Sequence, residues 1–81
     1  MKHASEETLD HLEPFLCELR SVDGLVETKR GVFYRKSKAF LHLHEDPSGL
    51  HADVRLGEDF ERQRVETEDE RAAFLAKIRS L

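Results

Sequence analysis

A turn signal in the middle of the chain constrains the fold more than any other feature of the sequence. Residues 45–49 read Glu-Asp-Pro-Ser-Gly, and this composition favours a tight reversal, because proline fixes one backbone φ and glycine accepts a positive one. The runs 38–44 and 50–56 on either side alternate apolar and polar side chains, as strands with two different faces do. The sequence therefore predicts an antiparallel β-hairpin around this turn.

The turn also predicts the register of the sheet, because the numbers of facing residues in an antiparallel pair add up to a constant. Five facing pairs follow: His44 with His51, Leu43 with Ala52, His42 with Asp53, Leu41 with Val54, and Phe40 with Arg55. A shorter turn at Lys36-Ser37 adds the strand 31–35. It pairs Tyr34 with Ala39, Phe33 with Phe40, and Val32 with Leu41.

Helical patterns flank the predicted sheet. Ser5 is a good N-cap, and it is followed by leucines at helical spacing, Leu9, Leu12, Leu16 and Leu19. We expect a helix over 5–21 that Pro14 kinks or divides in two and that Asp23-Gly24 ends. Near the C-terminus, Thr67 and Glu70 have the spacing of a capping box. The helix that follows has an apolar face of Phe74, Leu75, Ile78 and Leu81.

These patterns together predict an α+β fold. It has an N-terminal helix kinked near Pro14, a three- to four-stranded antiparallel sheet, and a C-terminal helix. The fourth strand is expected over 61–65. Because 81 residues suffice for one small core, we expect a single domain, 1–81, with residues 1–4 disordered.

The register divides the predicted sheet into two faces with different chemistry. One face is apolar and is expected to pack on the helices; it holds Val32, Tyr34, Ala39, Leu41, Leu43, Ala52, Val54 and Leu56. The other is the candidate binding face; it holds Phe33, Arg35, Phe40, His42, His44, His51, Asp53 and Arg55. Two phenylalanines on a polar face are typical of a surface that a partner covers, although the N-terminal arm or the curled edge of the sheet would also shield them. The leading hypothesis is a non-enzymatic interaction domain that binds an unknown protein or a second copy of itself.

The three histidines of the candidate binding face allow a second hypothesis. His42, His44, His51 and Asp53 are ligand types that zinc and other transition metals accept, and they come from neighbouring strands. The chain would then be a metal-binding protein or a small metallohydrolase. The same residues also suit a solvated polar face, with His42 hydrogen-bonded to Asp53, or a pH-sensitive surface.

A basic segment supports a third hypothesis, a nucleic-acid-binding domain. Five cationic residues and no acidic ones lie within 28–38: Lys29, Arg30, Arg35, Lys36 and Lys38. Beside Phe33 and Tyr34, they could contact phosphates and stack on bases. The net charge of −4 disfavours a polyanionic partner, because such partners bind to a positive field.

Enzymatic and membrane functions have less support in the sequence. Cys17, the one cysteine, lies among the leucines of the first predicted helix, where packing is a more common role than catalysis. No glycine-rich phosphate loop, nucleophile elbow or Cys-x-x-Cys pair occurs. Neither does a run as long as a signal sequence or a membrane span. We expect a cytoplasmic protein that binds no membrane.

The strands resemble a group of small uncharacterised bacterial proteins. The resemblance rests on Gly-Val-Phe-Tyr at 31–34, on a Phe-Leu-His-x-His-Glu-Asp-Pro motif at 40–47 and on Ala-Asp-Val-Arg at 52–55. More loosely, the order of elements over 14–81 is similar to that of the YjbR/MmcQ-like family. This second resemblance implies a double-wing α+β fold of a DNA-binding-like kind, with no established reaction and no catalytic residue to carry over.

Overall fold

The computed structural model describes residues 2–81 and has an α+β fold. Two helices, α1 (Glu6–His11) and α2 (Glu13–Arg20), precede the main strands, and α3 (Glu68–Arg79) follows them. The strands are β1 (Lys2–His3), β2 (Leu25–Lys29), β3 (Val32–Arg35), β4 (Lys38–Asp46), β5 (Gly49–Arg55) and β6 (Phe60–Arg64). The predicted class is therefore confirmed, and β6 occupies the place expected for the last strand.

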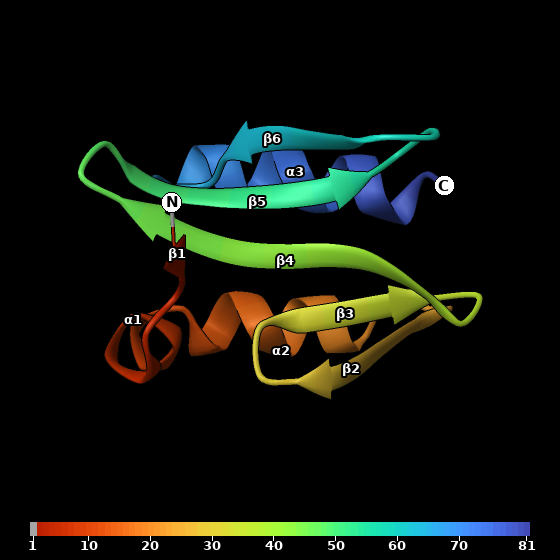
Figure 1. Ribbon diagram of the computed structural model, residues 1–81, viewed down its shortest axis with the longest axis horizontal. Helices are drawn as coiled ribbons and strands as arrows, with labels where there is room; N and C mark the ends of the chain where they lie inside the picture. The colour runs from red at the N-terminus through yellow and green to blue at the C-terminus, as the bar shows by residue number, and fades with distance from the viewer. Residues whose placement is uncertain (1) are drawn as a thin grey trace.

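The sheet is wider than the three to four strands predicted. Its order is β2-β3-β4-β5-β6, and all strand pairings of the described residues are antiparallel; β1 adds a sixth, two-residue strand beside the end of β4 (Figure 1). The strand β2 lies at an edge of the sheet and is mostly exposed. Polar residues such as Glu27 and Lys29 therefore interrupt the alternation of apolar and polar side chains that indicates a half-buried strand. The additional width comes from these edge elements.

Residues near the N-terminus lie beside β4. His3 faces His44 of β4, the Ala4 N–H donates to the Leu43 carbonyl at 3.1 Å, and Ala4 is buried. Disorder was expected over 1–4; the structure places residues 2–4 in or beside the sheet, and Met1 lies outside the described residues.

The predicted first helix is divided in two, as Pro14 indicates. Ser5 caps α1 by accepting a hydrogen bond from the Thr8 N–H at 3.2 Å. The chain leaves α1 at Leu12, and Pro14 follows Glu13 in the first turn of α2, where its missing N–H costs nothing. In this divided arrangement the four predicted leucines form one buried stripe, and each is at most 2% exposed.

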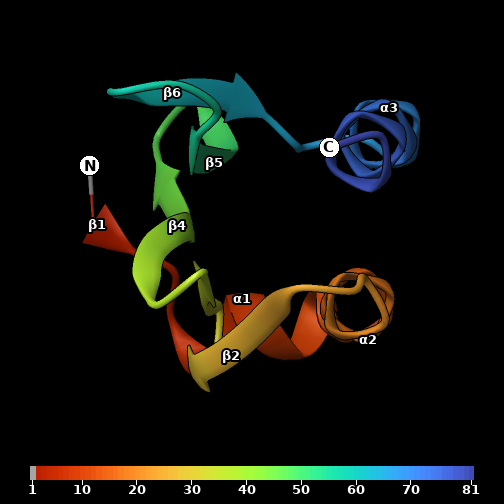
Figure 2. The same cartoon turned by 90° about the vertical axis from the view of Figure 1, so that its right-hand side faces the viewer.

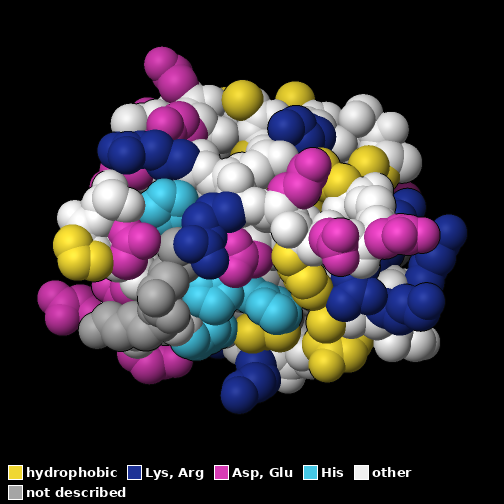
Figure 3. All heavy atoms as spheres, turned by 45° about the horizontal axis from the view of Figure 1, so that its top comes forward, with side chains coloured by type: hydrophobic (Ala, Val, Ile, Leu, Met, Phe, Trp, Pro, Cys, Tyr) yellow, Lys and Arg dark blue, Asp and Glu magenta, His cyan; other side chains and the backbone are white. Residues whose placement is uncertain are grey.

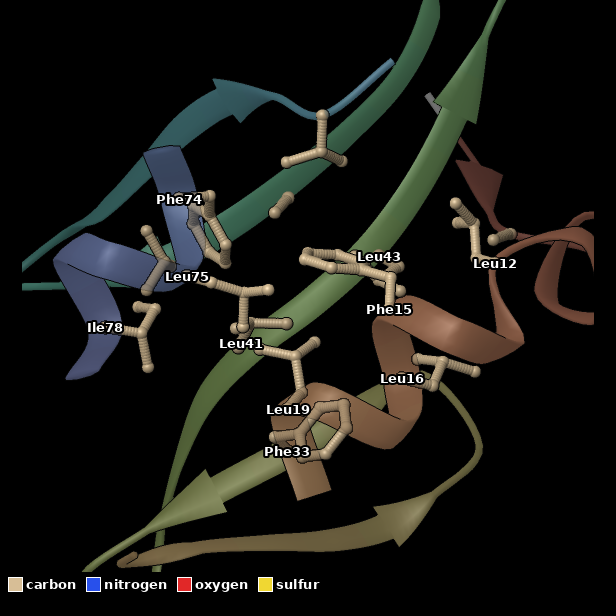
Figure 4. Close-up of a cluster of buried hydrophobic side chains, with 14 of the residues drawn as sticks. Leu12, Phe15, Leu16, Leu19, Phe33, Leu41, Leu43, Phe74, Leu75 and Ile78 are labelled. Carbon is tan, nitrogen blue, oxygen red and sulfur yellow. The ribbon is translucent and has the colours of Figure 1, made fainter. Parts of the chain in front are cut away.

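The core lies between one face of the sheet and the helices. Figure 2 shows the sheet curling, with α2 and α3 on the same side of it. Leu41, Leu43, Ala52 and Val54 face that side from β4 and β5, and Figure 4 shows Leu41 and Leu43 among side chains of both helices. Burying a side chain of this size contributes about 1.5–3 kcal/mol. This layer of apolar side chains therefore holds the helices on the sheet.

The helix α3 forms as its sequence predicts. Thr67 and Glu70 make both hydrogen bonds of the capping box, and Phe74, Leu75 and Ile78 enter the core. Leu81 lies beyond the end of the helix and is 53% exposed, so its predicted place on the apolar face is wrong. None of the described helices is long and apolar enough to cross a membrane.

The register between β4 and β5 is as predicted from Leu41 to His44, but the predicted pair of Phe40 with Arg55 is absent. The register between β3 and β4 shifts within the strands. The pairs Leu41 with Val54 through His44 with His51 are all present. Across the Lys36-Ser37 turn, Tyr34 faces Ala39 as predicted, whereas Phe33 faces Leu41 and Val32 faces His42. The residue left over on β4 is Phe40, which makes the irregularity a β-bulge.

The bulge corrects the predicted division of the two faces. Phe33 turns inward and is completely buried, and Phe40 also joins the core at 4% exposure. Tyr34 and its neighbours Val32 and Ala39 move to the outer face, because side chains alternate along a strand. A sheet without the bulge would expose both phenylalanines, so the burial of two aromatic rings favours the shifted register.

Candidate functional site

The site is the side of the sheet opposite α2 and α3, which we call the open face. His42 and His44 project from β4, and His51 and Asp53 project from β5, with His42 facing Asp53 and His44 facing His51. These four residues lie together as the sequence predicts. Arg55 continues the same alternation on β5, so the structure keeps five of the eight residues predicted for the binding face.

The histidines form a connected cluster at the centre of the open face. The ring centroids of His42 and His44 are 5.8 Å apart, and those of His3 and His44 are 6.1 Å apart. Figure 3 shows the histidine side chains gathered on this side of the molecule, with basic and acidic groups around them. His3 could not be predicted from the sequence, because the two-residue pairing of β1 leaves no alternating pattern.

Carboxylates lie beside two of the histidines. His44 Nε2 is 3.4 Å from Asp53 Oδ2, and His51 Nδ1 is 3.9 Å from Asp46 Oδ1. Asp53 also accepts a hydrogen bond from Arg62 Nε at 3.1 Å. Hydrogen bonds from the Ser48 hydroxyl and backbone N–H lower the pKa of Asp46. Each carboxylate is therefore held in place and is near enough to form an ion pair when its histidine is protonated.

His42 favours the neutral form more strongly than a free histidine. Burial is the main cause that lowers its pKa, and the charge of His44 lowers it further, against the opposing effect of Asp53. Its ring also lies 5.2 Å from that of Phe60 on β6. The His42 ring is consequently neutral near neutral pH and lies beside an apolar side chain.

The predicted metal ligands are close in space without forming a ligand set. Among residues 2–81, no group of three or more His, Cys, Asp or Glu side chains is arranged to hold a metal ion. Asp53 is already engaged with Arg62 as well as His44. The geometry gives no support to the zinc hypothesis for His42, His44, His51 and Asp53.

Exposed apolar side chains are concentrated on the same open face. Four large hydrophobic residues of the described chain are exposed: Val26 at 62%, Leu81 at 53%, Phe60 at 38% and Tyr34 at 36%. All but Leu81 lie on the open face, where Val26 faces Tyr34 and Phe60 faces Arg55. Arg55 stacks on Phe60, with its guanidinium carbon 4.7 Å from the ring centroid. Val26 was missed because β2 was not predicted as a strand, and Tyr34 because the bulge reversed β3. Phe60 was missed because the last strand was expected to begin at residue 61.

Several residues predicted for the candidate binding face or for nucleic-acid binding lie elsewhere in the structure. Phe33 and Phe40 are in the core, and Arg35 shares the inward parity of Phe33 and stacks on Phe40 at 5.7 Å. Lys29 and Arg30 lie at the β2–β3 turn, whereas Arg35, Lys36 and Lys38 lie at the β3–β4 turn, at opposite ends of β3. The predicted basic hairpin is therefore not one patch.

Ion pairs further remove Arg30 from any basic surface. Its guanidinium is 2.9 Å from Glu6, 2.7 Å from Asp10 and 2.8 Å from Glu13. Hydrogen bonds from Arg20 and Arg30 lower the pKa of Glu13 to about 2. This end of the hairpin serves to join β2 and β3 to the N-terminal helices.

Comparison with known proteins adds no relative to this description. The chain matches no protein-family model, no curated protein and no solved structure. The likeness to YjbR/MmcQ-like proteins therefore stays a prediction, and the function has to be argued from the geometry.

Proposed function

We propose that this chain is a non-enzymatic interaction domain and that its open face binds a second copy of the chain. The observation that carries the proposal is the placement of the exposed apolar residues. Val26, Tyr34 and Phe60 all lie on the one sheet face that no described helix covers. Aromatic residues and arginine, here Phe60 and Arg55, are also enriched where proteins bind proteins.

The charge of the open face favours a protein over a nucleic acid as the partner. Asp53 and Arg62 neutralise one another, and the lowered pKa of His42 keeps that ring neutral. Arg55, at the end of β5, is a basic group of the open face without an acidic partner in the described chain. A polyanion requires a stronger positive field than this.

The chemistry of imidazole favours a second copy as the occupant. A neutral imidazole has one N–H donor and one nitrogen acceptor, so a histidine can pair with the same histidine of another copy across a two-fold axis. A patch made only of arginine or only of aspartate would repel the same patch on a second copy of the chain. The sheet curves away at its edges (Figure 2), so we expect a small, weak interface.

Sedimentation analysis over a range of protein concentrations tests the proposal. We expect the wild-type chain to form dimers reversibly at about 0.1–1 mM near neutral pH, as small interfaces do. Phe60→Ser should remain monomeric throughout this range. Leu81→Ser is the matched control, because it removes a comparably exposed apolar residue that lies off the open face; it should associate as the wild type does.

Three results of this experiment would contradict the proposal. They are a wild-type chain that stays monomeric at every concentration, an association that Phe60→Ser leaves intact, and an equal loss in both variants. Circular dichroism of each variant checks that the fold is retained, which is expected because Phe60 lies on the edge strand β6.

A further inference from the structure

A hollow of about 470 Å³ opens at the end of the sheet where the β3–β4 turn lies beside the segment that follows β5. Its charged lining consists of Arg35, Lys36, Lys38, Arg55 and Glu58. This is the right-hand end of the molecule in Figure 1, and Figure 3 shows Lys and Arg side chains gathered at the same end. We propose that this hollow, here called the cationic hollow, binds the phosphate group of a small molecule.

The pairing of the arginines singles out this place. Six of the eight arginines hold a carboxylate or a backbone carbonyl: Arg20, Arg30, Arg62, Arg64, Arg71 and Arg79. Arg35 and Arg55 have neither an ion pair nor a hydrogen bond within residues 2–81, and Arg55 Nε is shielded from solvent. Both line the cationic hollow. The two arginines without a partner therefore face the same space, although they come from different strands.

Each of these arginines is held by an aromatic ring instead of an acid. Arg35 lies over Phe40, and Arg55 lies over Phe60. Stacking uses the flat face of a guanidinium and leaves the N–H groups along its edge free to donate. Planar N–H pairs of this kind match the oxygens of a phosphate group. The aromatic rings thus orient two donors without neutralising them.

The β3–β4 turn brings a third cation, Lys36, to the cationic hollow in a backbone conformation that lysine rarely adopts. Lys36 and Ser37 have positive φ values of 53° and 65°, which a two-residue hairpin turn requires and which Asn-Gly adopts most readily. Residues other than glycine in this region often mark functional sites. Lys36 brings a cation to the lining where asparagine would make an easier turn.

The charge and size of the hollow define the ligand class. Four cations against Glu58 leave three net positive charges, which suits a phosphate or polyphosphate rather than a single carboxylate. The hollow is compact, and the other basic residues of the hairpin lie at the opposite end of β3. A nucleic-acid strand would need a continuous basic track. A small phosphorylated molecule is therefore the better fit.

Chemical-shift titration with inorganic tripolyphosphate tests the site at a protein concentration where the chain is monomeric. We expect saturable shifts at Lys36, Lys38 and Gly57. Arg35→Gln should weaken binding about tenfold, because one charge-assisted hydrogen-bonding group is lost. Lys29→Gln is the matched control: it removes the same charge from the other end of β3 and should leave affinity within about twofold, as screened distant charges do. Equal losses in both variants, or no saturable shift, would overturn the proposal.

Three further variants test the site separately from the fold. Lys36→Asn should raise the melting temperature, because asparagine adopts the turn more easily, and yet weaken tripolyphosphate binding. Ser37→Gly should stabilise the turn in the same way and leave binding unchanged. Glu58→Gln should tighten binding, because it removes the one acidic group of the lining. Binding that follows stability across these variants contradicts the site, and so do shifts from single-stranded DNA that extend to Lys29.

Discussion

Neighbouring residues of β4 meet very different surroundings on the two sides of the sheet. Leu41 and Leu43 are at most 1% exposed among side chains from the helices, whereas the side chain of His44, on the open face between Leu43 and Glu45, is 20% exposed. The residues buried on the helix-covered face are all apolar, whereas the open face combines histidines, ion pairs and exposed aromatic rings. The difference indicates that one face determines the stability of the fold and that the other is available for binding.

The largest expected difference in unfolding free energy is between variants of Phe33 and Tyr34, which the bulge places on opposite faces of the sheet. Phe33→Ala should lower the free energy of unfolding by about 3–5 kcal/mol, because it empties a fully buried position. Tyr34→Ala, its exposed neighbour, should cost less than about 1 kcal/mol. Urea denaturation of both variants measures the two losses. The predicted register without a bulge would reverse this order.

A second test applies the same comparison within β4. Leu41→Ala should cost about 2–5 kcal/mol, as truncation of a buried leucine does. His42→Ala should cost clearly less, because its side chain is only partly buried. Equal losses in urea denaturation would mean that the open face contributes as much to stability as the core does.

A smaller effect is expected in the pH dependence of stability, through His42 on the open face. The pKa of His42 lies below its ordinary value of 6.5, so the unfolded chain takes up this proton more readily than the folded protein. Stability should therefore fall as the pH drops through 6.5. The groups that act on His42 are His3, His44, Asp53 and Arg55.

His42→Gln should make this loss of unfolding free energy smaller between about pH 7.5 and pH 5.5, the range over which histidine titrates. His11→Gln, which changes an exposed histidine on α1 outside the open face, should retain the wild-type dependence. A dependence that is unchanged in His42→Gln would show that other groups carry it. Both variants are compared with the wild type at a concentration where all are monomeric.

Much of the fold could be predicted from the sequence because its signals are local. The Pro47-x-Gly49 turn, the Thr67 capping box and the division at Pro14 each act within a few residues, and all three are present. The four central residues of the candidate site followed from the register of β4 and β5. A single correct turn was therefore enough to bring His42 and His44 beside Asp53.

The remaining features depend on contacts between distant parts of the chain. The bulge at Phe40 forms because two aromatic rings are better buried against the helices, which no local pattern reveals. His3 reaches the open face through a two-residue pairing. Arg55 and Arg35 line the same hollow only when β3, β4 and β5 have assembled. Edge strands and shared hollows of this kind follow from the tertiary structure alone.

The central claim is that the open face, and not the helix side, meets a second copy of the chain. An amide chemical-shift dilution series tests it most directly, because it locates the contact as well as detecting it. The proposal predicts concentration-dependent shifts on the strands of the open face, around Tyr34, His42 and Phe60, with α2 and α3 unchanged. Shifts concentrated on the helices, or no dependence on concentration at all, would contradict the claim.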